Sequence, residues 1–256
     1  MKKGKVYIVG AGPGDPELIT LKAVKCLAAA DVILYDRLVN PVLLEHAKEE
    51  AEFIYCGKIP GNHCVPQEVI QKLLIEKSLE GKTVVRLKGG DPFIFGRGGE
   101  EAEALARLGI AFEIVPGITA GIAAPAYAGI PVTHREYGGS FAFVTGHCTT
   151  GKPDNIRWDC LAKGVDTISI YMGMKNLPYI CKELQTFGKS PQTPIAVIEQ
   201  GTTMNQRIVT GTLESIVEIV KSEEVTNPAM IVIGEVVNLS ERLSWFSQRK
   251  REKVFI

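Results

Sequence analysis

The segment 88–101 carries the densest set of residues that could do chemistry. Five glycines fall in the eleven positions 89–99, together with two phenylalanines and with charged groups at both ends. Glycines let a backbone approach a ligand closely, and Asp91 can accept hydrogen bonds from ribose hydroxyls or from an ammonium group. Arg97 and Glu100 stand where a helix is predicted to begin, so their side chains would project from its first turn. A plain turn needs fewer glycines, and we therefore predict that this loop binds a ligand.

A second glycine-rich turn, Gly10-Ala11-Gly12-Pro13-Gly14-Asp15, follows a predicted strand and leads into a helical stretch. The dinucleotide fingerprint G-x-G-x-x-G would need glycine at position 15, where aspartate stands. Pro13 also removes an amide that a pyrophosphate would bind. No G-x-x-x-x-G-K-[ST] motif occurs in the chain. The sequence therefore contains neither of the two common phosphate-binding motifs. A tight connection between strand and helix explains the glycines of this turn as well as a binding role does.

Composition excludes several classes of protein. The chain has 29 basic and 29 acidic residues in 256, which argues against an electrostatic nucleic-acid binder. No apolar run approaches the roughly 20 residues needed to span a bilayer, and the apolar run 6–9 is too short for a secretory signal. We predict a cytoplasmic globular protein without membrane or nucleic-acid partners, whose last residues, 247–256, form a solvated basic tail.

A metal site is not predicted. The six cysteines form no C-x-x-C pair, and the four histidines are scattered. These residues make no zinc template, so reduced thiols are the better interpretation.

The pattern of apolar residues predicts alternating strands and helices. Strands are expected at residues 5–9, 32–35, 83–87, 112–115, 141–145, 167–171, 195–198 and 230–233, and helices at 18–28, 69–79, 100–108 and 212–220. Asp15-Pro16-Glu17 has the composition of a helix start, and Gly109 that of a helix end. Nearly continuous apolar strands between helices predict an α/β fold with mostly parallel sheets. We expect an N-terminal α/β lobe at 1–116 and a C-terminal α/β lobe at 117–246, with a cleft between them.

The motifs, taken together, resemble those of the tetrapyrrole methylases, a family of class III methyltransferases. They follow one another in the family's order across about residues 4–246. The matching segments are 9–16, 34–39, 86–101, 115–120, 128–135, 143–147, 171–173, 200–202 and 244–246. The segment 149–155 departs from the family pattern.

The resemblance implies two α/β lobes, a homodimer, and S-adenosyl-L-methionine as cofactor, released as S-adenosyl-L-homocysteine. It implies two methylations of uroporphyrinogen III, on rings A and B, giving precorrin-2 through precorrin-1 for sirohaem or cobalamin synthesis. The family's cofactor contacts correspond here to Pro13, Gly89, Gly90, Asp91, Ile94, Thr119, Ala120, Met172 and Gly201.

The substrate carries eight carboxylates, so its pocket should present cationic and amide donors. The resemblance implies that substrate is bound by Arg97, Glu100, His134, Arg135 and Met172. It also casts Asp36 as a proton acceptor and Lys58 as a proton donor, with Arg97 as a rival for the base.

Other readings stay open at this point. A sister methylase could act later on the corrin ring, for example on precorrin-4. Related methylases act on ribosomal RNA or on diphthine precursors, but the neutral charge of this chain counts against an RNA substrate.

Overall fold

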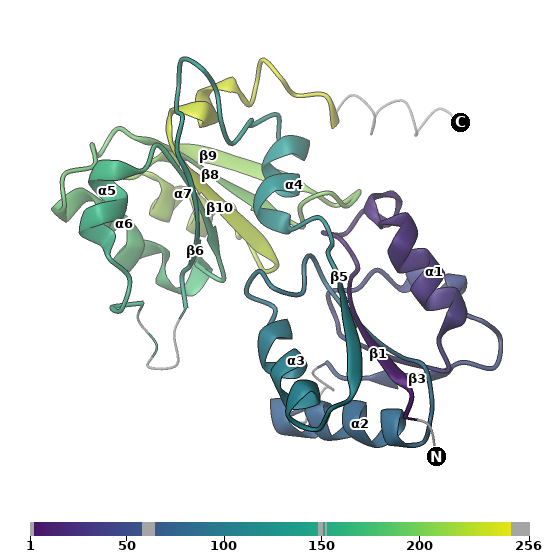
Figure 1. The fold of residues 1–256 in the computed structure, drawn as a ribbon. Coiled ribbons are helices and arrows are strands. Elements are labelled where there is room, and N and C mark those ends of the chain that lie inside the picture. The colour runs from purple at the N-terminus through teal and green to yellow at the C-terminus, as the bar shows by residue number, and fades with distance from the viewer. Residues whose placement is uncertain (1–2, 58–64, 148–150, 152, 247–256) are drawn as a thin grey trace, which may run out of the picture. The chain divides into compact units, whose positions relative to one another are not determined.

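The computed structural model describes residues 3–57, 65–147, 151 and 153–246 (Figure 1). Internal contacts divide the chain into two compact units, Met1–Thr119 and Ala120–Ile256. They are called the N-terminal unit and the C-terminal unit below, and each is described by itself. Lys58 and most of the segment 149–155 lie outside the described residues, as does the tail from 247 onward.

The N-terminal unit alternates strands and helices. Its elements are β1 (Lys5–Gly10), α1 (Leu21–Ala29), β2 (Val32–Tyr35), β3 (Glu52–Tyr55), α2 (Gln67–Leu79), β4 (Val84–Lys88), α3 (Gly98–Arg107) and β5 (Ala111–Val115), with short 3-10 turns at Pro16–Leu18 and Pro41–His46.

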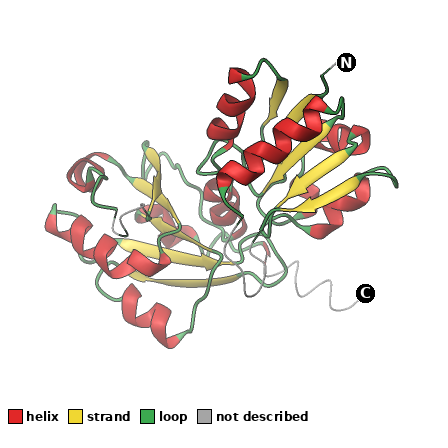
Figure 2. Cartoon of the chain, turned by 90° about the horizontal axis from the view of Figure 1, so that it is seen from below, coloured by secondary structure: helices red, strands yellow, loops and turns green. Residues whose placement is uncertain are grey.

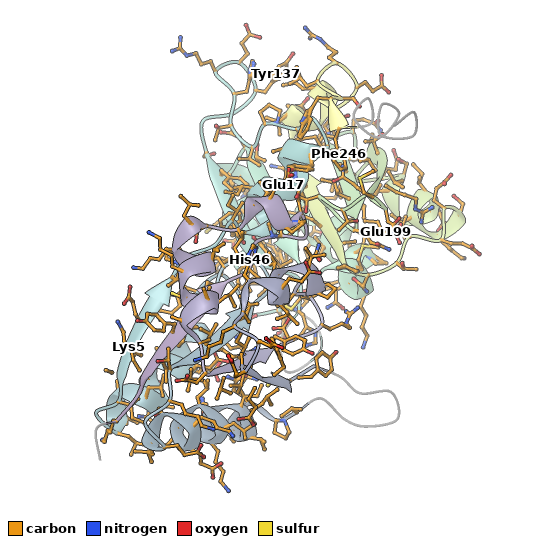
Figure 3. The ribbon with its side chains drawn as sticks, turned by 90° about the vertical axis from the view of Figure 1, so that its right-hand side faces the viewer. Lys5, Glu17, His46, Tyr137, Glu199 and Phe246 are labelled. Atoms are coloured by element: carbon orange, nitrogen blue, oxygen red, sulfur yellow. The ribbon has the colours of Figure 1, made fainter. Side chains whose placement is uncertain are left out.

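The sheet of the N-terminal unit is parallel throughout, in the order β3-β2-β4-β1-β5. Helix α1 packs on one face of it, and α2 and α3 pack on the other, each over its own apolar cluster. Figure 2 shows the yellow sheet between its red helices. At the edge strand β5, Glu113 pairs with Lys5 of β1, whose side chain is labelled in Figure 3. Since all five strands run the same way, their carboxyl ends meet at one edge of the sheet.

The first helix begins later than predicted. Asp15 caps only the 3-10 turn, where its side chain accepts a hydrogen bond from the Glu17 amide at 2.9 Å. Helix α1 starts at Leu21, because the Thr20 hydroxyl caps it by accepting from the Ala23 amide at 3.1 Å. Ile19, which lies between the 3-10 turn and Thr20, is extended, so the turn cannot continue into the helix. The helix end predicted at Gly109 is confirmed, since this residue has φ +58° two positions after α3 ends.

The C-terminal unit contains the second sheet and its covering helices. Its elements are α4 (Ala120–Tyr127), β6 (Phe141–Thr145), α5 (Trp158–Gly164), β7 (Thr167–Tyr171), α6 (Leu177–Thr186), β8 (Pro194–Glu199), β9 (Arg207–Thr212), α7 (Ile216–Ser222) and β10 (Ala229–Ile233), with 3-10 turns at Met174–Asn176 and Glu235–Leu239.

The α/β fold class is confirmed, but the strands of the second sheet are not mostly parallel. Its order is β6-β7-β10-β8-β9, and only β6 and β7 pair in parallel. β10 is antiparallel to both β7 and β8, and β9 is antiparallel to β8. The short connection 200–206 explains the last pairing, because a hairpin joins only antiparallel strands. Two reversals leave β8 running with β6 and β7, so these three strands end at one edge.

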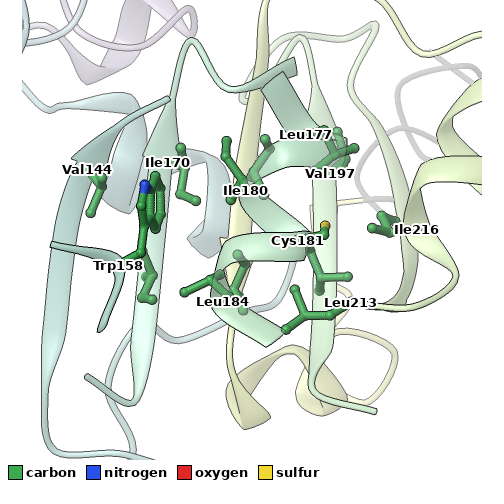
Figure 4. Packing of buried hydrophobic residues seen from close by; sticks show 14 of the residues in the cluster. Val144, Trp158, Ile170, Leu177, Ile180, Cys181, Leu184, Val197, Leu213 and Ile216 are labelled. Atoms are coloured by element: carbon green, nitrogen blue, oxygen red, sulfur yellow. The ribbon is translucent and has the colours of Figure 1, made fainter. Parts of the chain in front are cut away.

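The largest core cluster of the C-terminal unit lies under α5 and α6 (Figure 4). Trp158 is 2% exposed within it, and its indole N–H donates to the Pro153 carbonyl at 2.9 Å. A second cluster packs under α4. There Trp245, which is 42% exposed, donates its indole N–H to the Ala126 carbonyl at 2.9 Å and lies edge-on to Tyr127.

Candidate functional site

The loops after β1 and β4 occupy the natural ligand position of the N-terminal unit. These strands are neighbours, yet the chain leaves β1 toward α1 on one face and leaves β4 toward α3 on the other. In open parallel sheets, ligands bind outside the carboxyl ends of the strands at such a switch point. The two loops are joined directly. The Gly12 amide donates to the Gly90 carbonyl at 3.2 Å, and the Gly90 amide donates to the Gly12 carbonyl at 2.6 Å.

Three glycines meet where β1, β4 and β5 end. A Cβ on Gly117 would lie 2.4 Å from the Gly90 carbonyl oxygen and 2.8 Å from Gly10 Cα. The backbones of Gly10, Gly90 and Gly117 therefore lie so close together that a Cβ on Gly117 would clash with the other two. Asp91 fixes this meeting point, since Oδ2 accepts from the Gly117 amide at 3.1 Å and Oδ1 accepts from the Phe93 amide at 2.8 Å. The glycines thus bring bare backbone to the switch point.

Arg97 and Glu100 form one rigid unit at the start of α3. Arg97 Nε lies 2.9 Å from Glu100 Oε1, and Nη2 lies 2.8 Å from Oε2. The guanidinium holds the pKa of the Glu100 carboxyl below its ordinary value, and Glu100 in turn raises the pKa of Arg97. Both side chains are about half exposed. This bidentate pair presents a fixed cation beside a carboxylate.

Asp36 follows β2 directly and lies at the same edge of the sheet. Its Oδ1 accepts from the Leu38 amide at 3.0 Å, and its Oδ2 lies 3.5 Å from Nη2 of Arg86. Arg86 is 3% exposed and belongs to a buried group of charges that also contains Lys88 and Glu101. The apolar pattern of residues 83–87 does not predict this group of charges, because it treats the strand as uniformly apolar. The available signal was the two cations at alternate positions of one buried strand.

In the C-terminal unit, several predicted contacts gather where β7 and β8 end. The Gly121 amide, in the first turn of α4, donates to the Tyr171 hydroxyl at 2.7 Å and so places Ala120 beside that strand end. Met172 is the next residue and is half exposed. A Cβ on Gly201 would lie 2.5 Å from Cβ of Ala124, so the loop after β8 lies against α4.

His134 and Arg135 lie in a short turn of the C-terminal unit. His134 exchanges backbone hydrogen bonds with Gly138, its Nδ1 accepts from the Glu136 amide at 3.2 Å, and its ring packs on Tyr137 at 4.9 Å. Arg135 is exposed and forms no ion pair within the part of the chain that the structure describes. Its cation is thus available for an anionic ligand.

The predicted site residues therefore fall into two groups, one in each unit. The group of the N-terminal unit is Pro13, Asp36, Gly89, Gly90, Asp91, Ile94, Arg97, Glu100 and Thr119. The group of the C-terminal unit is Ala120, His134, Arg135, Met172 and Gly201. Pro13 and Ile94 are half-buried in the two loops that Gly12 and Gly90 join, and Thr119 is buried. Lys58 cannot be placed, since it lies outside the described residues.

Within the described ranges no group of three or more His, Cys, Asp or Glu side chains could hold a metal ion. A helix long and apolar enough to cross a membrane is likewise not found among those residues.

Backbone strain marks the same loops. Six described non-glycine residues have positive φ, and five of them lie in the motif segments, namely Phe95, Arg97, Met172, Gln200 and Thr202. The sixth, Glu224, lies outside them. A left-handed conformation costs an ordinary residue about 1–2 kcal/mol, and such strain concentrates at functional sites.

Replacing Met172 by glycine is expected to raise the free energy of unfolding and to weaken binding of the cofactor. Glycine accepts φ +55° without strain, so the free energy of unfolding should rise by about 1 kcal/mol. The family resemblance implies that Met172 contacts the cofactor, so we expect affinity for S-adenosylhomocysteine to fall at least about tenfold in this variant, which equals a loss of about 1.4 kcal/mol. Urea unfolding followed by far-UV circular dichroism and titration calorimetry measure the two effects.

Glu224→Gly is the matched control, because Glu224 has φ +50° and is exposed. It should gain similar stability while its cofactor affinity stays unchanged. Equal cofactor affinity in both variants would exclude Met172 as a cofactor contact.

The fold and the loops at these strand ends define a class of protein. A family model described as tetrapyrrole (corrin/porphyrin) methylases matches residues 5–217, and the chain belongs to this family. Among curated relatives, it is 66% identical over 237 residues to the uroporphyrinogen-III C-methyltransferase of Priestia megaterium, covering 93% of this chain and all of that protein. The chain spans about half the length of the siroheme synthases that it matches, for example 53% of the Pseudomonas paraeruginosa protein at 52% identity.

Solved structures agree with the sequence relatives. The uroporphyrin-III C-methyltransferase of Thermus thermophilus complexed with S-adenyl homocysteine is 42% identical, with a TM-score of 0.78 over 92% of this chain and 99% of that one. A cobalt precorrin-4 methyltransferase is 33% identical, with a TM-score of 0.81 over 91% of this chain and 95% of that one. The backbone is thus shared across the family, and sequence identity separates its branches.

Proposed function

We propose that the chain is an S-adenosylmethionine-dependent methyltransferase that methylates uroporphyrinogen III on rings A and B. The product is precorrin-2, formed through precorrin-1, for sirohaem or cobalamin-type tetrapyrroles. The observation that carries this proposal is the 66% identity to the Priestia megaterium enzyme over that protein's whole length. The relatives that are siroheme synthases support the sirohaem branch.

The residues present fit the cofactor. A sulfonium compound needs no pyrophosphate cradle, so Pro13 is tolerated in the first glycine turn. Gly89 and Gly90 bring bare backbone to the switch point, and Asp91 anchors that loop. Ile94, Ala120 and Met172 offer apolar contacts. S-adenosylmethionine, when bound, supplies an electrophilic methyl group.

Substrate recognition in this proposal rests on charge. Arg97, held by Glu100, and the exposed Arg135 meet carboxylates of the substrate, while Glu100 accepts from pyrrole N–H groups. Arg97 is the rival candidate for the base, but Glu100 raises the pKa of its guanidinium above the ordinary value, which favours Asp36 for that role. His134 completes the set in the C-terminal unit, and Lys58 is the proposed proton donor. Holding the reacting carbon and the methyl in contact lowers the barrier by proximity.

A proton must leave a bridge carbon of the substrate after the ring carbon has formed its new bond. The electron pair of that C–H bond then returns to the ring system, and a positioned base takes the proton. Asp36 is the better placed candidate in geometry, because its carboxylate is fixed at the edge of the sheet by Leu38 and Arg86 and is still about a quarter exposed.

A later corrin-ring methylase is the second candidate. The cobalt precorrin-4 methyltransferase aligns with a TM-score of 0.81, as high as that of the uroporphyrin enzyme, so the backbone does not discriminate. The higher sequence identity to the early enzymes favours uroporphyrinogen III.

The decisive experiment is an anaerobic incubation with S-adenosylmethionine and uroporphyrinogen III, followed by mass spectrometry of the oxidised tetrapyrrole. We expect a gain of two methyl groups. No gain, with S-adenosylhomocysteine still bound in calorimetry, would transfer the assignment to a later corrin methylase. No gain and no cofactor binding would contradict the assignment to either substrate.

We further propose a homodimer with two-fold symmetry, the commonest state of soluble oligomers, and a cytoplasmic location. Light scattering coupled to size-exclusion chromatography measures the oligomeric state.

A further inference from the structure

One carboxylate in the N-terminal unit is completely buried among charged and polar side chains. Glu101 Oε1 accepts hydrogen bonds from Gln67 Nε2 at 3.0 Å, from Arg86 Nε at 3.1 Å and from Lys88 Nζ at 3.1 Å. Glu101 is 0% exposed, and its second oxygen has no hydrogen-bond partner among the described residues. Three donors from α2 and β4 thus converge on a single oxygen of α3.

Stability does not explain this cluster. Its surroundings on the same face of the sheet are apolar, formed by side chains such as Ile8, Leu34 and Leu105. Burying charges costs solvation, and well-packed apolar residues in their place usually serve a fold as well or better. Burial, followed by the neighbouring Arg86, lowers the pKa of Lys88 below its ordinary value. A role in the site is therefore a better explanation.

The cluster reaches the site through Arg86. Its Nε is bound to Glu101, its Nη1 donates to the Leu34 and Leu87 carbonyls at 3.4 and 3.2 Å, and its Nη2 lies 3.5 Å from Asp36 Oδ2. The guanidinium is thus held on one side by a buried anion and by backbone, and it meets the Asp36 carboxylate on the other.

We propose that Arg86 is a positioning residue that orients the Asp36 carboxylate toward the substrate, and that Glu101 is the buried anchor of Arg86. The inference rests on the proposed function, in which Asp36 takes the bridge proton. Arginine suits this task because its planar fork contacts both carboxylates at fixed angles, whereas lysine offers one point charge. Arg86 itself need not touch the substrate.

A double-mutant cycle separates positioning from general support of the fold. The pair Arg86→Met/Glu101→Gln removes a cation and an anion together, and the amide oxygen of the introduced glutamine can still accept a hydrogen bond from Lys88, which loses its ion-pair partner. We expect it to lower the melting temperature, because Lys88 loses its buried anion, and to keep wild-type affinity for S-adenosylhomocysteine when measured well below that temperature. Its rate of methyl gain should fall about 10²-fold, the lower end of what a positioned base contributes. In an Asp36→Asn background the same pair should change the rate less than about twofold, because the group that it positions is already lost.

The matched control is Arg107→Met/Glu103→Gln, which removes an exposed ion pair of 2.9 Å from the same helix and should leave all readings unchanged. If the pair Arg86→Met/Glu101→Gln fails to fold, Arg86→Lys is carried through the same cycle instead, because it keeps a cation beside Glu101. The inference would be overturned if the pair Arg86→Met/Glu101→Gln slowed methyl gain equally in the wild-type and Asp36→Asn backgrounds. It would also be overturned if the pair, in the wild-type background, kept a rate within twofold of the wild type. Absence of methyl gain by the wild-type protein would overturn the proposed function and the inference with it.

Discussion

Arg97→Ala is expected to lose most turnover, about 10²-fold or more, while still binding S-adenosylhomocysteine like the wild type. Two of the guanidinium nitrogens are fixed by Glu100, and Nη1 has no hydrogen-bond partner in the described part of the chain. The side chain is therefore a preorganised cation with a donor left for a substrate carboxylate or for the reacting region. Initial rates of methyl gain by mass spectrometry and calorimetry of cofactor binding measure the two quantities separately.

Arg107→Ala is the control for this result, since Arg107 lies on the same helix and also pairs with a glutamate. Alanine at position 97 keeps a Cβ at φ +59°, so backbone strain is unchanged by the substitution. Arg97→Lys should give an intermediate rate, because it retains charge but loses the fork. Unimpaired turnover in Arg97→Ala would remove Arg97 from the site.

Gly117→Ala is expected to damage the meeting point of β1, β4 and β5. The new Cβ would lie 2.4 Å from the Gly90 carbonyl oxygen, which is backbone and cannot rotate away. Overpacking of this kind costs about 1–3 kcal/mol of unfolding free energy. Because Gly90 belongs to the loop proposed to bind the cofactor, we expect affinity for S-adenosylhomocysteine to fall by an order of magnitude or more. Urea unfolding by circular dichroism and calorimetry test both effects.

Gly99→Ala makes the same chemical change in open space. Apart from its chain neighbours and the backbone of its own helix, no atom of the described residues lies within 4 Å of the added Cβ, and the position is the second residue of α3. It should stabilise the protein by about 0.5–1 kcal/mol, the usual gain over glycine in a helix. If Gly117→Ala unfolds at the same urea concentration as Gly99→Ala, the close approach of the three loops is not as described.

Apolar pattern predicted the buried part of the fold well, since each of the eight expected strands has a counterpart in the structure. The two strands that were not predicted, β3 and β9, are edge strands with largely exposed or half-exposed residues. Both strands carry charged or polar residues among their apolar ones and so lack the continuous apolar run on which the prediction rests, whereas the other two edge strands, β5 and β6, were predicted. Helices α4, α5 and α6 were not predicted either, and in α4 Gly121 and Pro125 interrupt the helical composition.

The directions of strands could not be predicted in the C-terminal unit. Alternation with helices predicted parallel pairing, yet β10 inserts between β7 and β8 in the opposite direction. Nothing in the local sequence of β10 records its neighbours, since pairing is decided by long-range packing.

The sequence alone indicated which loops carry the candidate site, because glycines and arginines are concentrated in the motif segments. The sequence did not reveal how the parts are held. The link from Asp91 to Gly117 spans 26 residues, and the convergence of Gln67, Arg86 and Lys88 on Glu101 depends on how α2 and α3 pack on the sheet. Left-handed backbone at Arg97 and Met172 is likewise invisible in residue type, because neither residue favours it.

The placement of the two indole side chains has a spectroscopic consequence. The chain contains two tryptophans, Trp158 and Trp245, and both belong to the C-terminal unit. Trp158 is enclosed in the core and should emit at short wavelength, while the partly exposed Trp245 should emit further to the red. Intrinsic tryptophan fluorescence therefore reports events around α4 and α5, and the switch-point loops after β1 and β4 have no indole reporter of their own. A tryptophan at the exposed Phe93 position would give the N-terminal unit its own optical signal.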